Sequence, residues 1–226
     1  MRYREFINED IEKNNQVSDN IHPQQNDDSE PVTIHSPSIA TEPETWDDKT
    51  QTAIFAPNGT APSSINGISF LPWHGPSSIE GWKKIDGQTN LNEQPIDAGH
   101  KNIGAGTVII ESDGRVWLTQ PTNGFGGYSY TFPKGTADAG MSLQANAIRE
   151  TWEETGLKVK IISVIGDFSR STSVARYYLA KRISGTPVNM GWESQAVCLV
   201  PLRNTKDLLN RAIDHSIIDS AFGGVR

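Results

Sequence analysis

Hydrophobic positions become regular only in the second half of this 226-residue chain. Residues 105–110 (AGTVII) and 115–120 (RVWLTQ) are rich in β-forming side chains, and Asp113-Gly114 between them is a strong tight-turn signal. The two runs therefore predict a β-hairpin. By the same pattern of apolar positions, further strands are expected at 129–132, 158–168, 174–182 and 196–202.

A helix is predicted over residues 143–155. Ser142 is a suitable N-cap, and Gly156 suits the left-handed position that ends many helices. The helix would carry one apolar stripe, formed by Leu143, Ala147, Ile148, Thr151 and Trp152. Residues 204–222 are typical of one or two terminal helices. Strands interleaved with two helical segments indicate an α/β fold, a mixed sheet with helices on both faces.

The first hundred residues have a different pattern. Residues 1–50 are poor in aliphatic side chains and rich in Asn, Asp, Ser, Gln and Pro, so they are expected to form a disordered tail. Its deletion should then leave stability and turnover nearly unchanged. Residues 51–103 are punctuated by Gly and Pro but anchored by Trp73 and Trp82, and we expect an irregular extension that packs on the core. Residues 104–226 would form the main domain.

The net negative charge belongs to residues 1–50 and says little about what the rest of the chain binds. Residues 1–50 hold 12 acidic and 4 basic side chains, a balance of -8 against -7 for the whole chain, so the remainder is near +1. No basic stripe or recognition-helix pattern is visible, and DNA binding is not expected.

A single cysteine, Cys198, excludes a disulfide framework. Without an apolar leader or membrane span, a cytoplasmic location is the default, with an exported effector and the oligomeric state left open.

Residues 149–157 (RETWEETGL) crowd three glutamates together. At about 100° per residue, Glu150, Glu153 and Glu154 fall within an arc of about 100°, where like charges repel. Arg149 lies beside this arc and could orient one carboxylate. One interpretation is a solvated helix face. The other is a site of hard oxygen ligands suited to Mg²⁺ or Mn²⁺.

The flanking residues favour the second interpretation. From Gly135 to Leu157 the chain resembles the box of the Nudix hydrolase family, G-x5-E-x7-R-E-U-x-E-E-x-G-U, where U is a bulky aliphatic, and it matches seven of nine specified positions. The two departures are Met141 in place of the first glutamate and Thr151 in place of the aliphatic residue. The wider resemblance covers roughly 104–202 and includes "FPKG" ahead of the box.

This resemblance implies an α/β/α sandwich and metal-dependent hydrolysis of a nucleoside diphosphate linked to another group. It implies that Glu150, Glu153 and Glu154 bind the metal, that Arg149 braces them and that the Gly135 backbone approaches the metal. Loss of the first glutamate, at Met141, should weaken the support of Arg149 without removing a ligand. The small-molecule partner would be a nucleotide.

Glu193 precedes the strand expected at 196–202 and resembles the loop glutamate that several family members use as base or extra ligand. A base there would help deprotonate the attacking water. An ordinary exposed glutamate is the alternative.

The substrate is less well defined. The proline of many ADP-ribose hydrolases is absent, whereas Tyr177 and Tyr178 resemble the tyrosine of the dinucleoside polyphosphate hydrolases, which makes a dinucleoside polyphosphate the best candidate. Because adjacent strand residues face opposite ways, at most one tyrosine can stack on a base. Further candidates to contact substrate are Phe125, Tyr128, Lys134, Arg170 and Arg176. Alternatives are ADP-ribose or nucleotide sugars, diphosphoinositol, RNA caps, and a non-catalytic nucleotide sensor.

Overall fold

The computed structural model describes residues 20–223. Its centre is a seven-stranded sheet in the order β1-β9-β5-β4-β8-β7, with β6 paired to β4. The strands are β1 (Ala53–Phe55), β4 (Asn102–Ile110), β5 (Arg115–Pro121), β6 (Lys134–Thr136), β7 (Leu157–Ser169), β8 (Ser173–Gly185) and β9 (Ser194–Pro201). β4 and β8 run parallel, whereas the other paired strands are antiparallel. The mixed sheet predicted from the sequence is confirmed.

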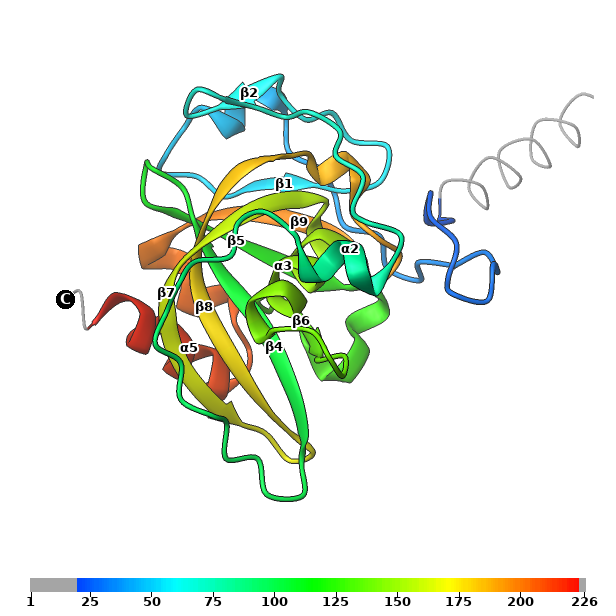
Figure 1. Cartoon of the computed structure of the whole chain (residues 1–226). Coiled ribbons are helices and arrows are strands. Elements are labelled where there is room, and N and C mark those ends of the chain that lie inside the picture. The colour runs from blue at the N-terminus through cyan, green and yellow to red at the C-terminus, as the bar shows by residue number, and fades with distance from the viewer. Residues whose placement is uncertain (1–19, 224–226) are drawn as a thin grey trace, which may run out of the picture.

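Helices cover both faces of this sheet (Figure 1). One core cluster contains Ala147 and Ile148 of α3 (Leu143–Thr155) and Trp82 of α2 (Ile79–Lys83). The other contains Ile217 and Ile218 of α5 (Ala212–Phe222), which follows the short helix α4 (Thr205–Leu208). The α/β/α sandwich is therefore confirmed. Within residues 20–223, no helix combines the length and the apolar character needed to cross a membrane.

Local signals in the sequence placed most elements correctly. The hairpin turns at Asp113-Gly114, where β4 and β5 pair in antiparallel register. Ser142 caps α3 by accepting a hydrogen bond from the Ala145 amide, and Gly156 ends the helix at φ 70°. The strand expected at 129–132 is wrong. Only a single bridge forms there, between Thr131 and Thr119, because Pro133 follows directly and has no amide hydrogen to extend the ladder.

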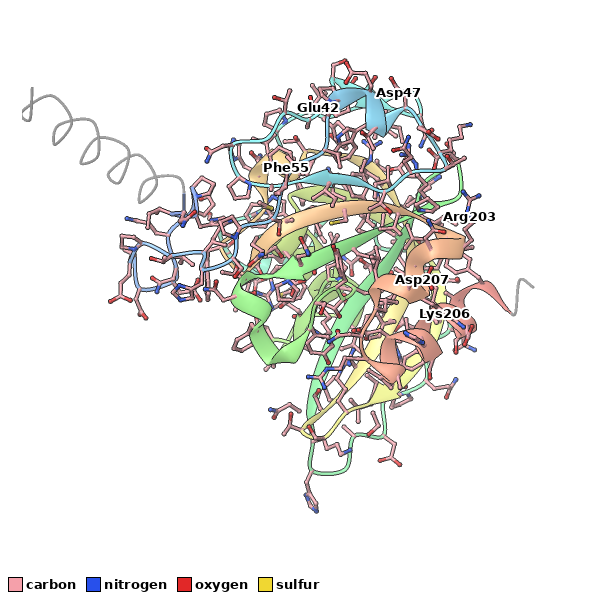
Figure 2. All side chains as sticks on the ribbon, turned by 180° about the vertical axis from the view of Figure 1, so that it is seen from behind. Glu42, Asp47, Phe55, Arg203, Lys206 and Asp207 are labelled. Atoms are coloured by element: carbon pink, nitrogen blue, oxygen red, sulfur yellow. The ribbon has the colours of Figure 1, made fainter. Side chains whose placement is uncertain are left out.

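The expectation that residues 1–50 are disordered is wrong for residues 20–50, while residues 1–19 lie outside the described part of the chain. Trp46 ends the 3₁₀ helix η1 (Pro43–Trp46) and is fully buried, and its ring packs on those of Phe70 and Trp117. Ile34 is also buried. Figure 2 shows Glu42 and Asp47 flanking η1 at one end of the molecule. A few large side chains suffice to anchor a segment whose average composition is polar.

Residues 51–103 lie against the sheet and α3. β1 extends the sheet by pairing with β9, and Figure 2 shows Phe55 on this added strand. A short β-ribbon of β2 (Ser64–Ile65) and β3 (Ile68–Ser69) follows. Further on, Trp73 and Trp82 pack with Trp152 of α3 at ring-centroid distances of 5.7 to 6.0 Å. The extension therefore contacts the same helix that carries the glutamate cluster.

Candidate active site

Gly135 on β6 lies directly against the carboxylate of Glu150 on α3. β6 pairs with the central strand β4, where Ala105 stands opposite Gly135. A Cβ atom at position 135 would overlap the Glu150 carboxylate, so only glycine allows this approach. The box glycine therefore sets how closely the β6 backbone and the first box carboxylate can meet.

Arg149 connects the acidic residues around it. Its guanidinium lies 2.6 Å from Oε1 of Glu150 and 3.1 Å from Oε2 of Glu153. A third carboxylate, Asp138 of the β6–α3 loop, approaches to 3.4 Å. The Asp138 amide donates a 2.8 Å hydrogen bond to Oδ1 of Asn146, which fixes the loop on the helix. Asp138 thus gives Arg149 an acidic loop partner although position 141 holds methionine.

Sequence reasoning missed Asp138. The only signal for it was an acidic residue in the variable interval between Gly135 and the helix, which is too common to interpret without coordinates.

Thr151 is buried on α3, where the box has an aliphatic residue. Its hydroxyl donates to the Ala147 carbonyl at 2.7 Å and lies 2.6 Å from the hydroxyl of Thr107 on β4. Because both hydroxyls have partners, burying them does not leave an unsatisfied polar group. Thr107 interrupts the apolar run of β4, and that interruption was the sequence signal for this partner.

Glu150 and Glu154 of the box are buried, whereas the side chain of Glu153 is 37% exposed. Burial raises the pKa of Glu150 to about 8, and the neighbouring Glu153 and Glu193 charges add to this rise although Arg149 opposes it. Burial likewise raises the pKa of Glu154 to about 8, against the opposing charge of Lys134. The pKa of Glu153 is also raised, mainly by burial. Their ionised forms are thus costly without a counter-charge.

Such a donor set fits a divalent cation, which prefers hard oxygen ligands and would stabilise the ionised carboxylates. The carboxylates are not arranged around a common point in this structure. Arg149 holds Glu150 and Glu153, and within residues 20–223 no three Asp, Glu, His or Cys side chains converge on one point as a metal site. Rotation of these side chains away from Arg149 would accompany metal binding.

Glu193 is exposed on the loop that leads into β9, and this loop is tied to the box helix. The Gly191 amide donates to the Glu153 carbonyl at 2.7 Å, and the Thr122 amide donates to the Glu193 carbonyl at 2.8 Å. The charge of Glu193 contributes to the raised pKa values of Glu150, Glu153 and Glu154, so its carboxylate is near enough to act on all three. Partial shielding and the nearby Asp27 raise the pKa of Glu193 itself.

Three of the residues predicted to contact substrate are instead part of the folded interior. Tyr177 and Tyr178 do face opposite ways, but each is fully buried, one in each core cluster. Arg176 is buried and forms ion pairs with Asp167 at 2.7 Å and Glu93 at 3.1 Å. The prediction that these three side chains bind substrate is therefore wrong, because β8 is a central strand covered on both faces.

The other four candidates lie near the glycine-rich segment between β5 and β6. Phe125 lies in the 3₁₀ segment η2 (Thr122–Gly127) and is 83% exposed. Tyr128 directly follows this segment and is half-buried. Nζ of Lys134 lies 5.0 Å from the Tyr128 ring centroid. Arg170 donates to the hydroxyl of Tyr128 at 3.0 Å and pairs with Asp214 at 3.1 Å.

Fold and site together define a domain that carries carboxylates on one helix against a glycine of the neighbouring strand. The chain belongs to the NUDIX domain family, whose domain matches residues 100–220, more than half of its length. Nudix hydrolases generally use divalent metal ions.

Two curated relatives illustrate the similarity. The chain is 34% identical to an RNA pyrophosphohydrolase of Vibrio cholerae over 104 residues, 46% of this chain and 54% of that protein. It is 33% identical to an RNA pyrophosphohydrolase of Caulobacter vibrioides over 101 residues, 44% of this chain and 56% of that protein. The chain thus spans about half the length of the curated relatives it matches.

Among solved structures, a NUDIX hydrolase from Nitrosomonas europaea is similar with a TM-score of 0.48 and 17% identity, over 56% of this chain and 91% of that chain.

Proposed function

We propose that this protein is a metal-dependent hydrolase of a pyrophosphate bond in a nucleoside diphosphate linked to another group. The observation that carries the proposal is the pairing of Arg149 with both Glu150 and Glu153, beside the close approach of Gly135 to the Glu150 carboxylate. Glu154 follows on the same helix, and the charge of Glu150 acts on its carboxyl group. Carboxylates and a substrate pyrophosphate repel each other, so they share a site only with cations between them.

Mg²⁺ is the proposed cofactor, and Mn²⁺ would serve the same chemistry. A bound divalent ion lowers the pKa of its water, polarises phosphoryl oxygens and neutralises the charge of the leaving group. Glu150, Glu153 and Glu154 would hold the ion through their carboxylate oxygens. Without a bound ion, Arg149 pairs with Glu150 and Glu153, orients them and offsets their mutual repulsion.

Glu193 is proposed as the base that accepts the proton of the attacking water. Its loop is held by two backbone hydrogen bonds, one from the Gly191 amide to Glu153 of α3 and one from the Thr122 amide of η2 to the Glu193 carbonyl, while Glu193 stays exposed. A raised pKa brings a carboxylate closer to the range in which a general base works well near neutral pH.

The proposed substrate is a nucleotide with a polyphosphate chain. The burial of Tyr177 and Tyr178 removes the tyrosine argument for a dinucleoside polyphosphate, which stays in the proposal on the resemblance of "FPKG" and on the exposed Phe125. RNA that carries a pyrophosphate bond is the second candidate, because the curated relatives that match at 33–34% identity are named RNA pyrophosphohydrolases.

A substrate panel tests the proposal. The purified chain is incubated with Mg²⁺ and diadenosine tetraphosphate, 5′-triphosphorylated RNA, a capped RNA, a diphosphoinositol or ADP-ribose, and the products are identified by mass. We expect cleavage of a polyphosphate at a higher kcat/KM than of ADP-ribose. Binding of every nucleotide without cleavage, with either metal, would favour a nucleotide-sensing module and contradict the proposal.

A further inference from the structure

Three cationic side chains surround the ring of Tyr128. Nζ of Lys134 lies 5.0 Å from the ring centroid, the guanidinium carbon of Arg211 lies 5.2 Å away, and that of Arg170 lies 5.7 Å away. They come from β6, from the residue that precedes α5 and from the β7–β8 turn, so the fold brings together groups far apart in sequence. Arg211 was not among the residues predicted from the sequence.

The positive charge of this cluster is only partly balanced. Asp214 pairs with Arg170 at 3.1 Å. Neither Lys134 nor Arg211 forms an ion pair with any carboxylate within residues 20–223. Like charges this close repel one another, and a bound anion would relieve the repulsion.

The glycine-rich loop holds Arg211 in place. Nη2 of Arg211 donates to the Gly126 carbonyl at 2.7 Å, and Asn210 bonds both the Gly127 carbonyl and the Ser129 amide. Gly127 has φ 74°, and a Cβ atom there would overlap Nη2 of Arg211. Only glycine combines this backbone conformation with the close approach of the guanidinium. The arginine is therefore pre-positioned, which lowers the entropy lost when it binds a ligand.

The cluster adjoins the proposed catalytic carboxylates. Lys134 directly precedes Gly135 in β6, and its charge acts on Glu154 of α3. Phe125 of the glycine-rich loop is 83% exposed and presents a flat face for stacking. Because Lys134 belongs to the cluster and also to the strand of the box glycine, a chain of phosphates bound at the box would extend toward the cluster.

We propose that Lys134, Arg170 and Arg211 around Tyr128 form an anion subsite that binds a phosphate of the substrate beyond the bond that is cleaved. The inference rests on the proposed function for its place in a substrate, and it narrows the substrate class to nucleotides with three or more phosphates. Arginine forks and lysine ammonium groups are the side chains that recognise phosphate oxygens.

Binding of inorganic tripolyphosphate, measured by calorimetry in excess chelator, tests the subsite without the metal site. We expect one-to-one binding that weakens at least about tenfold in Arg211→Gln, the scale of losing one charge-assisted hydrogen bond. Lys134→Gln should weaken it similarly. The matched control is Arg203→Gln. Like Arg211, Arg203 is exposed and donates to a single backbone carbonyl, that of Thr50. Arg203, labelled in Figure 2, lies on a surface away from η2. Equal affinity in wild type and Arg211→Gln would overturn the subsite.

Kinetics separate this inference from the proposed function. For an active enzyme, Arg211→Gln should raise KM for a dinucleoside tetraphosphate about tenfold more than for a two-phosphate substrate, with Tm unchanged. A uniform rise for both substrates would overturn the assignment. If no substrate is hydrolysed but tripolyphosphate binding still depends on Arg211 and Lys134, the proposed reaction fails while the anion subsite stands.

Discussion

Nε2 of His22 lies 3.2 Å from the carbonyl oxygen of Ser194, although 172 residues separate the two in the sequence. The same loop is held by the hydroxyl of Thr122, which donates to the Trp192 carbonyl at 2.6 Å, and by the Thr122 amide on Glu193. Three consecutive carbonyls around the proposed base therefore have fixed partners. One of these partners belongs to a segment outside the residues matched by the family.

Deletion of residues 1–40 should lower both Tm and turnover. It removes the buried Ile34 and His22 and the bonds of residues 33–38 to Asn123 and Gln195. Losing one buried aliphatic side chain alone costs about 2–5 kcal/mol. Thermal unfolding and steady-state kinetics measure the effect, with a chain lacking only residues 1–19 as control because every described contact is kept. Unchanged Tm and kcat would restore the original expectation of an inert tail.

Glu153→Gln and Glu154→Gln should each lower turnover at least about a hundredfold, because each removes a charge that the metal and the transition state need. Excess chelator should abolish activity, and added Mg²⁺ should restore it. Glu80→Gln on α2 is the control, since its carboxylate is exposed and pairs only with Lys83. Full activity in chelator would contradict a metal-dependent reaction.

The stability of the metal-free protein should depend on pH through Glu150 and Glu154. Both have a pKa of about 8 in the folded chain, against 4.5 when unfolded, so the folded state binds the protons more tightly. Their contribution to the free energy of unfolding is present below about pH 4.5 and is lost as the pH rises toward 8.

If Mg²⁺ is held by the ionised carboxylates, as proposed, it should raise Tm more at pH 8 than at pH 6. Melting curves of wild type and of the Glu150→Gln/Glu154→Gln double variant, with and without Mg²⁺, isolate this contribution. A wild-type response to Mg²⁺ that matches the double variant at both pH values would show that these carboxyls are not the ligands.

Asp138 and position 141 should compensate for each other. Asp138→Asn removes one acidic partner of Arg149 and should lower kcat by a few-fold, since Glu150 and Glu153 still hold the guanidinium. Met141→Glu should be tolerated because Met141 is only half-buried, and it should recover kcat in the Asp138→Asn background. Kinetics of both single variants and the double variant form the cycle. Strictly additive effects would show that the two positions do not share Arg149.

Tyr177→Ala and Tyr178→Ala should both destabilise the fold, each by about 3–5 kcal/mol, the range for truncating a buried aromatic residue. Tyr178→Phe should cost less, because it keeps the ring and loses only the hydrogen bond to Glu93. Chemical denaturation measures these differences. A raised KM with unchanged stability would return one tyrosine to the substrate site.

Where structure follows from neighbouring residues, the sequence predicted it well. The Asp113-Gly114 turn, the Ser142 cap and the opposite orientation of Tyr177 and Tyr178 depend on local backbone rules. The box glutamates were found because their spacing on one helix is itself the signal.

Contacts between distant segments escaped prediction. Whether Tyr177 is buried depends on α5 and on Phe132 and Phe168, which no local pattern places there. In the sequence Trp46 is a lone aromatic residue in a polar stretch, and only the fold brings Phe70 and Trp117 against it. Asp138 and Arg211 gain meaning only from side chains brought close by the fold.

Trp152 lies between Glu150 and Glu153 along α3, and its ring meets those of Trp73 and Trp82 from the extension. Indoles at such distances share excitation energy, so the emission of the chain is sensitive to small changes in their mutual orientation. A ligand that shifts α3 as it draws the carboxylates from Arg149 would change that orientation. We therefore expect the intrinsic tryptophan emission of the unlabelled chain to report ligand binding, because Trp152 sits one residue from a proposed metal ligand.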